Sequence, residues 1–406
     1  METLGRARYV ELLEQDYDVC FDGTHTLVYL HIDKLKHYNR IHGVEAGDRV
    51  LHSMVRWASR KARKGQVARY AGDGIVFLVD KGAVDALGEQ ANAVLPTFGE
   101  VNGLQAKIGT MACQRPMGVA EVMHRILFAC SSIEDVEGVY SCAFEGDVKL
   151  RYDRRSYIVD HLDDAIARGE IQAWAQPIVR VLTGRICEVE MLARWQSERY
   201  GFLYPDEFIP VLEQHELIHK LDLEVIRLAC AQWAEARTCG TNVPLGVNLS
   251  RLDFKLCDVY GTIRDLMRRY DMPIDQMHIE ITESSAAHGH LISEGVRSFR
   301  EAGFQVYMDD FGSGFSSLGQ LAGMQFDVIK FDKGMLDDVE TNERARAVLA
   351  DSISMVKRLG VQTLCEGVET EEQVAFLRAV GCEKAQGYFF GRPSPHRTPM
   401  QRLDAR

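Results

Sequence analysis

The most regular feature of the chain is an alternation, from about residue 240 onward, between short apolar runs and longer segments of helical periodicity. Three of the helical segments are closed by a glycine at the position of a C-cap: 292–302 by Gly303, 345–359 by Gly360 and 371–380 by Gly381. Apolar strands with few polar residues inside them, alternating with helices, predict a parallel sheet wrapped by helices. The units between Ile171 and Gly391 predict an α/β fold of the (β/α)8 TIM-like barrel type.

Most of the apolar runs end on a polar or charged residue. The runs and the residues that follow them are 245–247 and Asn248, 278–279 and Glu280, 304–308 and Asp309, 326–329 and Lys330, 361–365 and Glu366, and 382–385 and Gln386. In a (β/α)8 barrel the carboxyl ends of the strands meet at one mouth, so these side chains should converge there. Because a buried polar group without a partner costs free energy, such a set predicts an active site.

The segment from Met308 to Leu318 contains two adjacent aspartates, Asp309 and Asp310, followed by a turn through Gly312 and Gly314. In isolation this segment is equally compatible with a solvated turn. Side chains alternate between the two faces of a regular strand, so both carboxylates can reach one site only at the end of the strand. Together with the other polar strand ends, the pair predicts a site for two cations.

The candidate ligands offer only oxygen atoms. They are Glu190, Asn248, Glu280, Asp309 and Asp310. No cysteine or histidine stands at a matching position, so Mg²⁺ or Mn²⁺ is expected instead of zinc. Two such ions suit the hydrolysis of a phosphodiester, because they activate water and neutralise the oxygens of an in-line displacement. Lys330 and Glu366 could orient that water or accept its proton.

Residues 157–406 resemble the EAL domain, the family of cyclic di-GMP phosphodiesterases, in motifs that cover the segment in order. The motifs are Gln176-Pro177-Ile178, Glu190-Met191-Leu192 with Ala193-Arg194-Trp195, Asn248-Leu249-Ser250, Glu280-Ile281-Thr282-Glu283, Asp309-Asp310-Phe311-Gly312, Lys330-Phe331-Asp332, Glu366-Gly367-Val368-Glu369 and Gln386-Gly387-Tyr388. The resemblance implies hydrolysis of cyclic di-GMP to linear pGpG. Met191, Phe331 and Cys365 replace the family's usual residues, and these apolar exchanges bear on rate or loop geometry more than on the chemistry.

The resemblance also implies a role for each matching residue. Glu190, Asn248, Glu280 and Asp309 would hold one metal ion, and Asp310 and Glu366 would help to hold a second. Lys330 and Glu366 would serve the attacking water. Glu283 would brace the loop 311–318, which in the family links metal binding with the contacts of a homodimer. The residues expected to contact the dinucleotide are Gln176, Leu192, Arg194, Asp332, Glu369 and Gln386, with Arg194 placed to meet a phosphate as a forked donor.

The first part of the chain follows a different pattern. A strand is predicted over 26–32, helical structure over 34–60 and a hairpin over 66–79 with its turn at 71–74. This order resembles the GGDEF family of diguanylate cyclases, which has a ferredoxin-like α/β palm. The matching residues are His31-Ile32-Asp33, Lys36, Asn39, Gly43 and Ala46-Gly47-Asp48.

Two positions depart from the GGDEF pattern. His31 stands where the family has a metal-binding aspartate, and the signature Ala71-Gly72-Asp73-Gly74-Ile75 lacks its glutamate. Without these carboxylates the support for two-metal phosphoryl transfer is lost, so no cyclase activity is expected. The family's inhibitory site keeps Arg63 but has Gln66 in place of its aspartate, which argues against product binding there.

A nucleotide pocket could nevertheless persist in this degenerate domain. Lys36 matches the family's phosphate-contacting lysine, and Asn39 and Asp48 match its guanine-reading pair. Such a pocket could bind GTP as an effector without consuming it. The alternative is that these residues cap helices or satisfy the hairpin and have only a structural role.

The composition fits two domains, expected over 1–148 and 149–406. A chain of 406 residues with 46% hydrophobic content can bury two sizeable cores. The net charge of −12 argues against a nucleic-acid partner. No apolar run approaches the roughly 20 residues that span a bilayer, and no signal segment opens the chain, so no membrane partner is expected. Ten cysteines without Cys-x-x-Cys spacing indicate reduced thiols and a cytoplasmic location.

Three functions remain open at this point. The first is hydrolysis of cyclic di-GMP. The second is a catalytically silent receptor that binds cyclic di-GMP and signals to a partner; such a receptor could discard metal ligands, whereas this chain keeps the full acidic set. The third is a bifunctional enzyme that also synthesises the dinucleotide, which His31 and Gly74 oppose.

Overall fold

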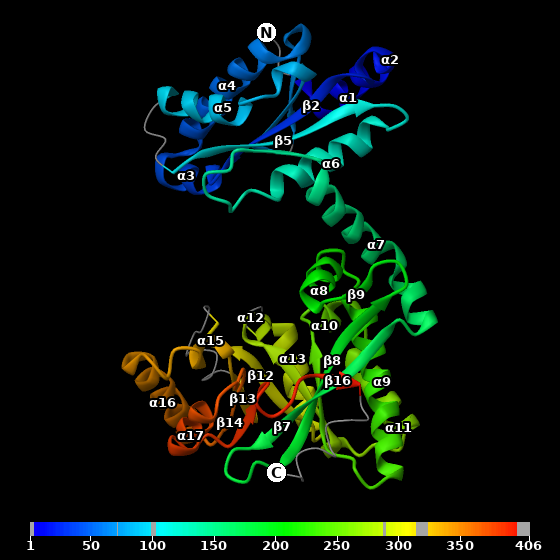
Figure 1. Ribbon diagram of the computed structural model, residues 1–406, viewed down its shortest axis with the longest axis vertical. Helices are drawn as coiled ribbons and strands as arrows, with labels where there is room; N and C mark the ends of the chain where they lie inside the picture. Colours follow the sequence, from blue (N-terminus) through cyan, green and yellow to red (C-terminus); the bar gives the residue numbers. More distant parts are fainter. Residues whose placement is uncertain (1–3, 71, 99–102, 287–289, 314–323, 396–406) are drawn as a thin grey trace. The chain divides into compact units, whose positions relative to one another are not determined.

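The computed structural model describes residues 4–70, 72–98, 103–286, 290–313 and 324–395 (Figure 1). The chain divides into two compact units, Met1–Arg154 and Arg155–Arg406. The division falls inside helix α7 (Gly146–Arg168), as does the boundary expected between residues 148 and 149. Each unit has its own apolar core.

The first unit contains a sheet whose four central strands have the ferredoxin-like order β3-β4-β2-β5, all antiparallel. Their bounds are Asp22–Asp33 for β2, Val67–Tyr70 for β3, Gly74–Asp80 for β4 and Gln105–Gln114 for β5. At the edges, β1 (Leu4–Gly5) pairs with β3 and β6 (Ser141–Ala143) pairs with β5, both in parallel. The predicted palm and hairpin are therefore confirmed.

Helices cover both faces of this sheet. Val28, Leu30 and Ile32 of β2 pack in one cluster with α3 (Leu35–His42), α4 (Val44–Lys61) and α5 (Leu87–Val94). Leu27 and Tyr29 point the other way, into a cluster with α1 (Arg6–Gln15), α2 (Tyr17–Cys20) and α6 (Val119–Ser131). The helical stretch predicted over 34–60 is broken at Gly43, whose φ of +86° interrupts the helix.

The second unit is a closed barrel of eight strands in the order β7-β15-β14-β13-β12-β11-β10-β8, closed by pairing of β7 with β8. Their bounds are Ile171–Arg180 for β7, Ile186–Ser197 for β8, Leu245–Leu249 for β10, Met277–Thr282 for β11, Gln305–Phe311 for β12, Val328–Phe331 for β13, Gln362–Cys365 for β14 and Lys384–Gln386 for β15. Two short strands pair alongside the barrel strands in antiparallel orientation: β9 (Gly201–Leu203) with β8, and β16 (Ser394–Pro395) with β7. The predicted TIM-like barrel is confirmed.

Strand β7 runs antiparallel to both of its barrel neighbours, whereas the alternation of strands and helices predicted a parallel sheet. Only residues 181–185 connect β7 to β8. A parallel pair needs a crossover of about a dozen or more residues, so this short connection can only form a hairpin. The remaining barrel pairs are parallel.

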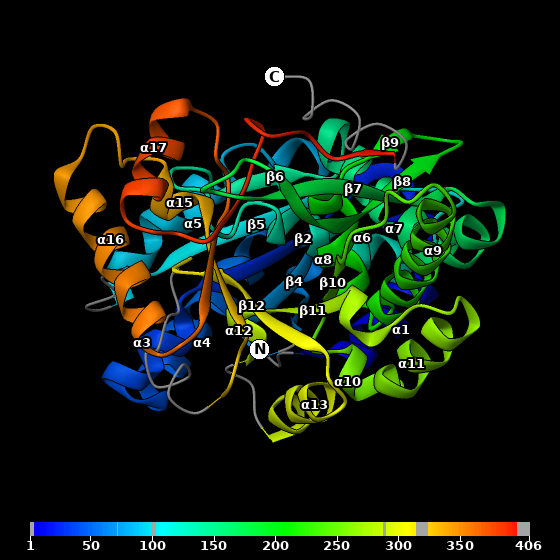
Figure 2. The same ribbon diagram turned by 90° about the horizontal axis from the view of Figure 1, so that it is seen from below.

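Helices surround the barrel. Their bounds are Pro205–Gln214 for α8, Ile218–Thr238 for α9, Asp253–Leu256 for α10, Val259–Arg269 for α11, Glu283–Ala286 for α12, His290–Glu301 for α13, Lys333–Leu336 for α15, Glu343–Arg358 for α16 and Glu371–Ala379 for α17. The views in Figures 1 and 2 both place α9 beside α11, and the two helices are in contact. Within the ranges given above, no helix combines the length and the apolar character needed to cross a membrane.

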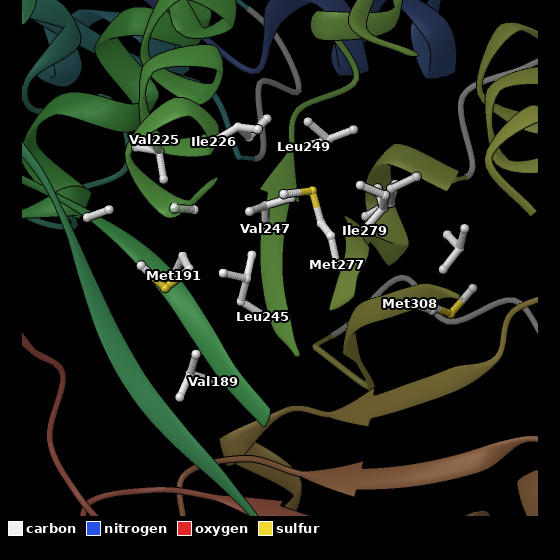
Figure 3. Packing of buried hydrophobic residues seen from close by; sticks show 14 of the residues in the cluster. Val189, Met191, Val225, Ile226, Leu245, Val247, Leu249, Met277, Ile279 and Met308 are labelled. Atoms are coloured by element: carbon white, nitrogen blue, oxygen red, sulfur yellow. The ribbon is translucent and has the colours of Figure 1, made fainter. Parts of the chain in front are cut away.

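Side chains on the barrel strands alternate between two environments. One set packs outward against the helices, and Figure 3 shows Met191, Val247 and Ile279 in the same cluster as Val225 and Ile226 of α9. The other set points into the barrel, where it forms two layers. The layer near the carboxyl ends, here called the mouth layer, contains Gln176, Glu190, Asn248, Glu280, Asp309, Lys330, Glu366 and Gln386. The layer below it, here called the inner layer, contains Ile178, Glu188, Gly246, His278, Tyr307, Val328, Leu364 and Lys384.

Candidate metal centre and active site

A single lysine lies among four carboxylates in the mouth layer. The ammonium of Lys330, which is fully buried, lies 3.0 Å from Asp309 Oδ1 and 2.7 Å from Glu366 Oε1. It also contacts Glu280 Oε2 and lies 3.6 Å from Glu190 Oε2. Each of these side chains comes from a different barrel strand or, for Glu366, from the residue that follows one, which is why residues far apart in the sequence meet here.

Adjacent carboxylates share this site because β12 departs from regular strand geometry. The register between β12 and β13 shifts between Met308 and Phe311, and Asp310 has a φ of +58°. This left-handed conformation costs a residue other than glycine roughly 1–2 kcal/mol. The backbone N–H of Asp310 donates to Asp309 Oδ1 at 3.0 Å, which holds the bend. Both side chains therefore turn to the same site. Residues in such strained backbone conformations are often found at functional sites.

The acidic oxygens form two sets that share one member. Glu190, Glu280 and Asp309 each offer an oxygen within 4.8 Å of the others, and so do Asp309, Asp310 and Glu366. Within the described ranges these are the only such groups of acidic, histidine or cysteine side chains. The sharing of Asp309 is the arrangement that a carboxylate bridging two cations would require.

One ammonium does not balance so many carboxylates. Burial raises the pKa of Glu366 to about 7, with Glu190 and Glu280 adding to the rise and Lys330 opposing it. Burial and the neighbouring carboxylates likewise raise the pKa of Asp309 despite Lys330. For Glu280, burial alone would raise the pKa, but Lys330 and His278 outweigh it and lower the value to about 2. The site therefore holds excess negative charge, which divalent cations would neutralise.

Amide side chains fix the orientation of Glu190. Asn248 Nδ2 donates to Glu190 Oε1 at 2.8 Å, and Gln386 Nε2 donates to Glu190 Oε2 at 2.6 Å. Gln386 Nε2 also lies 3.1 Å from Gln176 Oε1, so the antiparallel strand β7 still delivers its glutamine to the mouth layer. Asn248 thus lies beside the acidic set.

A cavity of about 320 Å³ opens above the acidic residues. Four of the residues expected to contact substrate line it: Gln176, Leu192, Glu369 and Gln386. Gly367, Gly387 and Tyr388 also line it; they belong to the motifs quoted above but were assigned no role. Lys333 lines it as well and was not singled out from the sequence. Lys333 stands three residues after Lys330 and pairs with Glu369 at 2.6 Å, so a second basic residue beyond a strand end was the signal that could have revealed it.

Arg194 and Asp332 have other contacts in this structure and do not line the cavity. Arg194 Nη1 donates to the carbonyl of Ala193 at 2.7 Å, and its guanidinium lies over the ring of Trp174. Asp332 Oδ1 accepts from the backbone N–H of Gly334 at 2.8 Å and so caps α15. Their contact with a dinucleotide stays a prediction.

Glu283 is buried at the start of α12, and its Oε2 accepts from the backbone N–H of Gly312 at 3.3 Å. This hydrogen bond holds the backbone at Gly312, two residues after Asp310. Of the loop 311–318 that it was expected to brace, residues 314–318 lie outside the described residues.

We expect Glu283→Ala to weaken Mn²⁺ binding and activity together by roughly tenfold or more, as for other residues that hold a ligand in place. The reason is that the backbone N–H of Gly312 loses its hydrogen bond to Glu283, so the bend at Asp309 and Asp310 is held less firmly. Calorimetric titration with Mn²⁺ would measure the metal affinity. Sedimentation of the same samples would test for the expected homodimer. Glu294→Ala, on the exposed face of α13, is the control, with no change expected. Wild-type metal affinity in Glu283→Ala would refute the link.

In the first unit, the residues proposed for GTP come from adjacent helices. Asn39 of α3 has a buried Oδ1 that, within the described part of the chain, accepts no hydrogen bond. A Cβ on Gly47 would lie 1.8 Å from that oxygen, so glycine there leaves room for the amide. Lys36 is exposed, and Asp48 is partly buried on α4. His31 Nδ1 lies 3.6 Å from Asp73 Oδ1, so the histidine faces the degenerate signature.

Comparison with known protein families matches both units. A model described as EAL domain matches residues 159–393, and one described as diguanylate cyclase, GGDEF domain, matches residues 5–118. The chain is 25% identical over 389 residues to the bifunctional diguanylate cyclase/cyclic di-GMP phosphodiesterase MucR of Pseudomonas aeruginosa. This match covers 92% of this chain and 56% of that protein. It is 36% identical over 236 residues to the oxygen sensor protein DosP of Escherichia coli, covering 58% of this chain and 30% of that protein.

Solved structures agree with the fold of the barrel unit. A MucR phosphodiesterase in complex with cyclic di-GMP superimposes with a TM-score of 0.55 at 29% identity, over 59% of this chain and 97% of that one. The FimX EAL domain from Pseudomonas aeruginosa superimposes with a TM-score of 0.53 at 18% identity, over 59% and 96%. The chain spans between about a third and somewhat over half of the length of the curated relatives that it matches.

Proposed function

Because the chain belongs to the EAL-domain family and carries a GGDEF domain ahead of it, we propose that it hydrolyses cyclic di-GMP to linear pGpG with two divalent metal ions. The observation that carries this proposal is the pair of acidic sets that share Asp309, grouped around Lys330 and open to a cavity. Relatives that match over most of this chain, such as PdeR of Escherichia coli at 26% identity, are named cyclic di-GMP phosphodiesterases.

The residues present fit a pair of hard cations. Glu190, Glu280 and Asp309, with Asn248 beside them, supply the oxygens of one position, and Asp309, Asp310 and Glu366 supply those of the other. All donors are carboxylate or amide oxygens, which suit Mg²⁺ or Mn²⁺. When bound, such ions would neutralise phosphate oxygens and lower the pKa of a water molecule.

The chain's own residues would perform the proton transfer. Water attacks the phosphorus and the bond from phosphorus to the 3′ oxygen breaks. The attacking water gives up a proton, and the 3′ oxygen takes up a proton and leaves as a hydroxyl group. Glu366 is placed to accept the proton of the water, because its carboxylate lines the cavity and lies beside Lys330. Lys330, 2.7 Å from Glu366, would orient the water and stabilise negative charge on the phosphate.

Residues around the cavity would hold the dinucleotide. Gln176 and Gln386 present amides beside Glu190, and Leu192 adds an apolar wall. Tyr388, which is half exposed at the rim, offers a ring face on which a guanine base could stack. Lys333 brings a positive charge to the same rim, where a phosphate would approach.

The direct test is incubation of the purified full chain with cyclic di-GMP and either Mg²⁺ or Mn²⁺, followed by chromatography of the nucleotides. The expected result is pGpG with either metal and none after treatment with a chelator. Ca²⁺ should inhibit, because its larger radius and looser coordination would separate the ligands. If the dinucleotide binds but stays intact with both metals, the chain is a receptor and the enzymatic proposal fails.

For the first unit we propose a regulatory role without catalysis. His31 and Gly74 replace the acidic residues that a cyclase needs, and none of the groups of potential metal ligands found in the described residues lies in this unit. GTP alone should therefore yield no cyclic di-GMP in the same chromatographic assay. The appearance of cyclic di-GMP would overturn this part of the proposal.

GTP should bind to the first unit and change the turnover of cyclic di-GMP. The unpartnered Asn39 Oδ1 is the observation that favours a nucleotide there, since a guanine base offers donors to such an oxygen. A coupling of about 1–3 kcal/mol would change affinity roughly 5- to 150-fold. Calorimetry should show GTP uptake that Asn39→Ala or Asp48→Ala abolishes, with Asp85→Ala as a control outside the pocket. No uptake at millimolar GTP would leave the unit with a structural role.

A further inference from the structure

The inner layer of the barrel is polar where a barrel core is normally apolar. Ile178, Tyr307, Val328 and Leu364 pack there as one buried cluster. Among them lie three ionisable side chains that the proposed mechanism does not use: Glu188, His278 and Lys384, all almost completely buried. Each stands two residues before a mouth-layer residue on its own strand and so points to the same side of the strand.

Glu188, Tyr307 and Lys384 satisfy one another. The ammonium of Lys384 lies 2.5 Å from Glu188 Oε1 and donates to the hydroxyl of Tyr307 at 2.8 Å. That hydroxyl donates in turn to Glu188 Oε2 at 2.9 Å. Burial, with Glu188 adding to the effect, raises the pKa of Tyr307, so the hydroxyl keeps its proton. A buried network in which each member has partners fixes the orientation of its side chains.

This network fixes the ring of His278. The imidazole stacks on the ring of Tyr307, with centroids 4.0 Å apart and planes inclined by 13°. Its Nε2 lies 3.0 Å from Glu280 Oε1 and 3.9 Å from Glu188 Oε2. An ionised carboxylate can only accept, so Nε2 carries the hydrogen and donates it to Glu280. Glu280 is thereby held at Oε1, and Oε2 faces Lys330 and the acidic set.

Gly246 leaves the space that this hydrogen bond needs. It lies directly opposite His278 in the pairing of β10 with β11. A Cβ at Gly246 would lie 2.1 Å from Glu280 Oε1 and 2.3 Å from His278 Nε2. Gly246 is not among the residues with positive φ, so the requirement is for space and not for backbone freedom. Strand β10 therefore also leaves room for the contact between Glu280 Oε1 and His278 Nε2.

We propose that His278 is a positioning residue that holds Glu280 Oε1 and aims Oε2 at the metal, with Glu188, Tyr307 and Lys384 holding the imidazole and Gly246 making room for it. This inference rests on the proposed metal-dependent function. Residues that orient a ligand in this way typically contribute 10- to 100-fold to metal affinity. His278→Leu should therefore bind Mn²⁺ 10- to 100-fold more weakly than wild type.

The test is calorimetric titration of Mn²⁺ into metal-free full chains, together with the Mn²⁺ concentration that gives half-maximal hydrolysis. In His278→Leu both values should rise, whereas the KM for cyclic di-GMP at saturating Mn²⁺ should change by less than about threefold. His278→Gln keeps an N–H at a similar reach and should recover most of the affinity. Gly246→Ala keeps the imidazole but displaces it, and should weaken Mn²⁺ binding as well.

Val328→Ala is the matched control, because Val328 packs in the inner layer without contacting Glu280 through a hydrogen bond. It should lower the unfolding temperature and leave Mn²⁺ affinity unchanged. Wild-type affinity in both His278→Leu and Gly246→Ala would overturn the inference, and so would an equal loss in Val328→Ala. If His278→Leu does not fold, Gly246→Ala and His278→Gln decide the matter. Absence of Mn²⁺ binding in the wild type would instead refute the proposed function.

Discussion

Asp309→Asn will lower the rate of cyclic di-GMP hydrolysis by several orders of magnitude and remove at least one of two Mn²⁺ equivalents. Asp309 is the one carboxylate that belongs to both acidic sets, so its replacement impairs both metal positions at once. Asparagine has nearly the same shape, and it removes a negative charge from a site crowded with like charges. The metal-free protein should therefore be at least as stable as wild type, since a functional site often reduces stability.

The control for this substitution is Asp327→Asn. Asp327 is also a partly buried carboxylate of the barrel unit, but it pairs with Arg300 and accepts from the backbone of Val306. We expect it to lower stability and to leave turnover near the wild-type value. Hydrolysis rates by chromatography and urea unfolding of the metal-free proteins provide both measurements. An Asp309→Asn variant that keeps more than a tenth of wild-type activity would contradict the shared-carboxylate arrangement.

Lys330→Met will strongly destabilise the metal-free barrel. Lys330 is the only lysine or arginine in contact with Glu190, Glu280, Asp309 and Glu366 among the described residues. Removing one partner of a buried ion pair typically costs about 3–5 kcal/mol, because the other partner stays buried without compensation. Mn²⁺ should restore part of this loss, by about 2.7 kcal/mol at a hundredfold excess over its Kd.

Urea unfolding of the barrel unit with and without Mn²⁺ measures both effects. Lys333→Met is the control, because Lys333 lies at the surface, is about half exposed and pairs only with Glu369 among the acidic residues. Surface ion pairs typically contribute less than about 1 kcal/mol, so this variant should unfold like wild type. Equal stability of Lys330→Met and wild type without metal would show that Lys330 does not compensate the acidic set. Activity of Lys330→Met should be almost lost even with Mn²⁺.

The strand pattern was sufficient to predict the barrel and six of the eight members of its mouth layer, all except Gln176 and Glu190. Polar residues that end apolar strands are conspicuous, and parallel strands bring their carboxyl ends to one side, so Glu280, Asp309 and Lys330 could be placed together without a structure. The direction of β7 was misjudged, although the five residues that join it to β8 already required a hairpin. Connection length was the missing criterion.

The inner layer was not predicted, because the strands were taken to contain few polar residues. Glu188, His278, Tyr307 and Lys384 all lie within strands and face the barrel interior. The alternation of side chains predicts this, since each residue stands two positions before a mouth-layer residue. What the sequence could not supply is the pairing: the contact of Lys384 with Glu188 joins residues almost 200 positions apart.

The bend at Asp310 could not be predicted from the residue types alone. Two adjacent aspartates at a strand end are compatible with a solvated turn, and only the register shift and the φ of +58° show that both turn to one site. Arg194 and Asp332 are of residue types that can bind a dinucleotide, but residue type does not fix where a side chain points. Arg194 packs on the ring of Trp174, and Asp332 caps α15.

The most direct test of a two-ion phosphodiester hydrolase is a titration of Mn²⁺ into metal-free wild-type protein in which the heat of binding and the rate of pGpG formation are recorded at each addition. We predict uptake of two Mn²⁺ equivalents per chain and a rate that follows occupancy of the second, rising from zero in the chelated protein. Full activity in the presence of chelator, or a rate that does not change as Mn²⁺ binds, would contradict the proposed function.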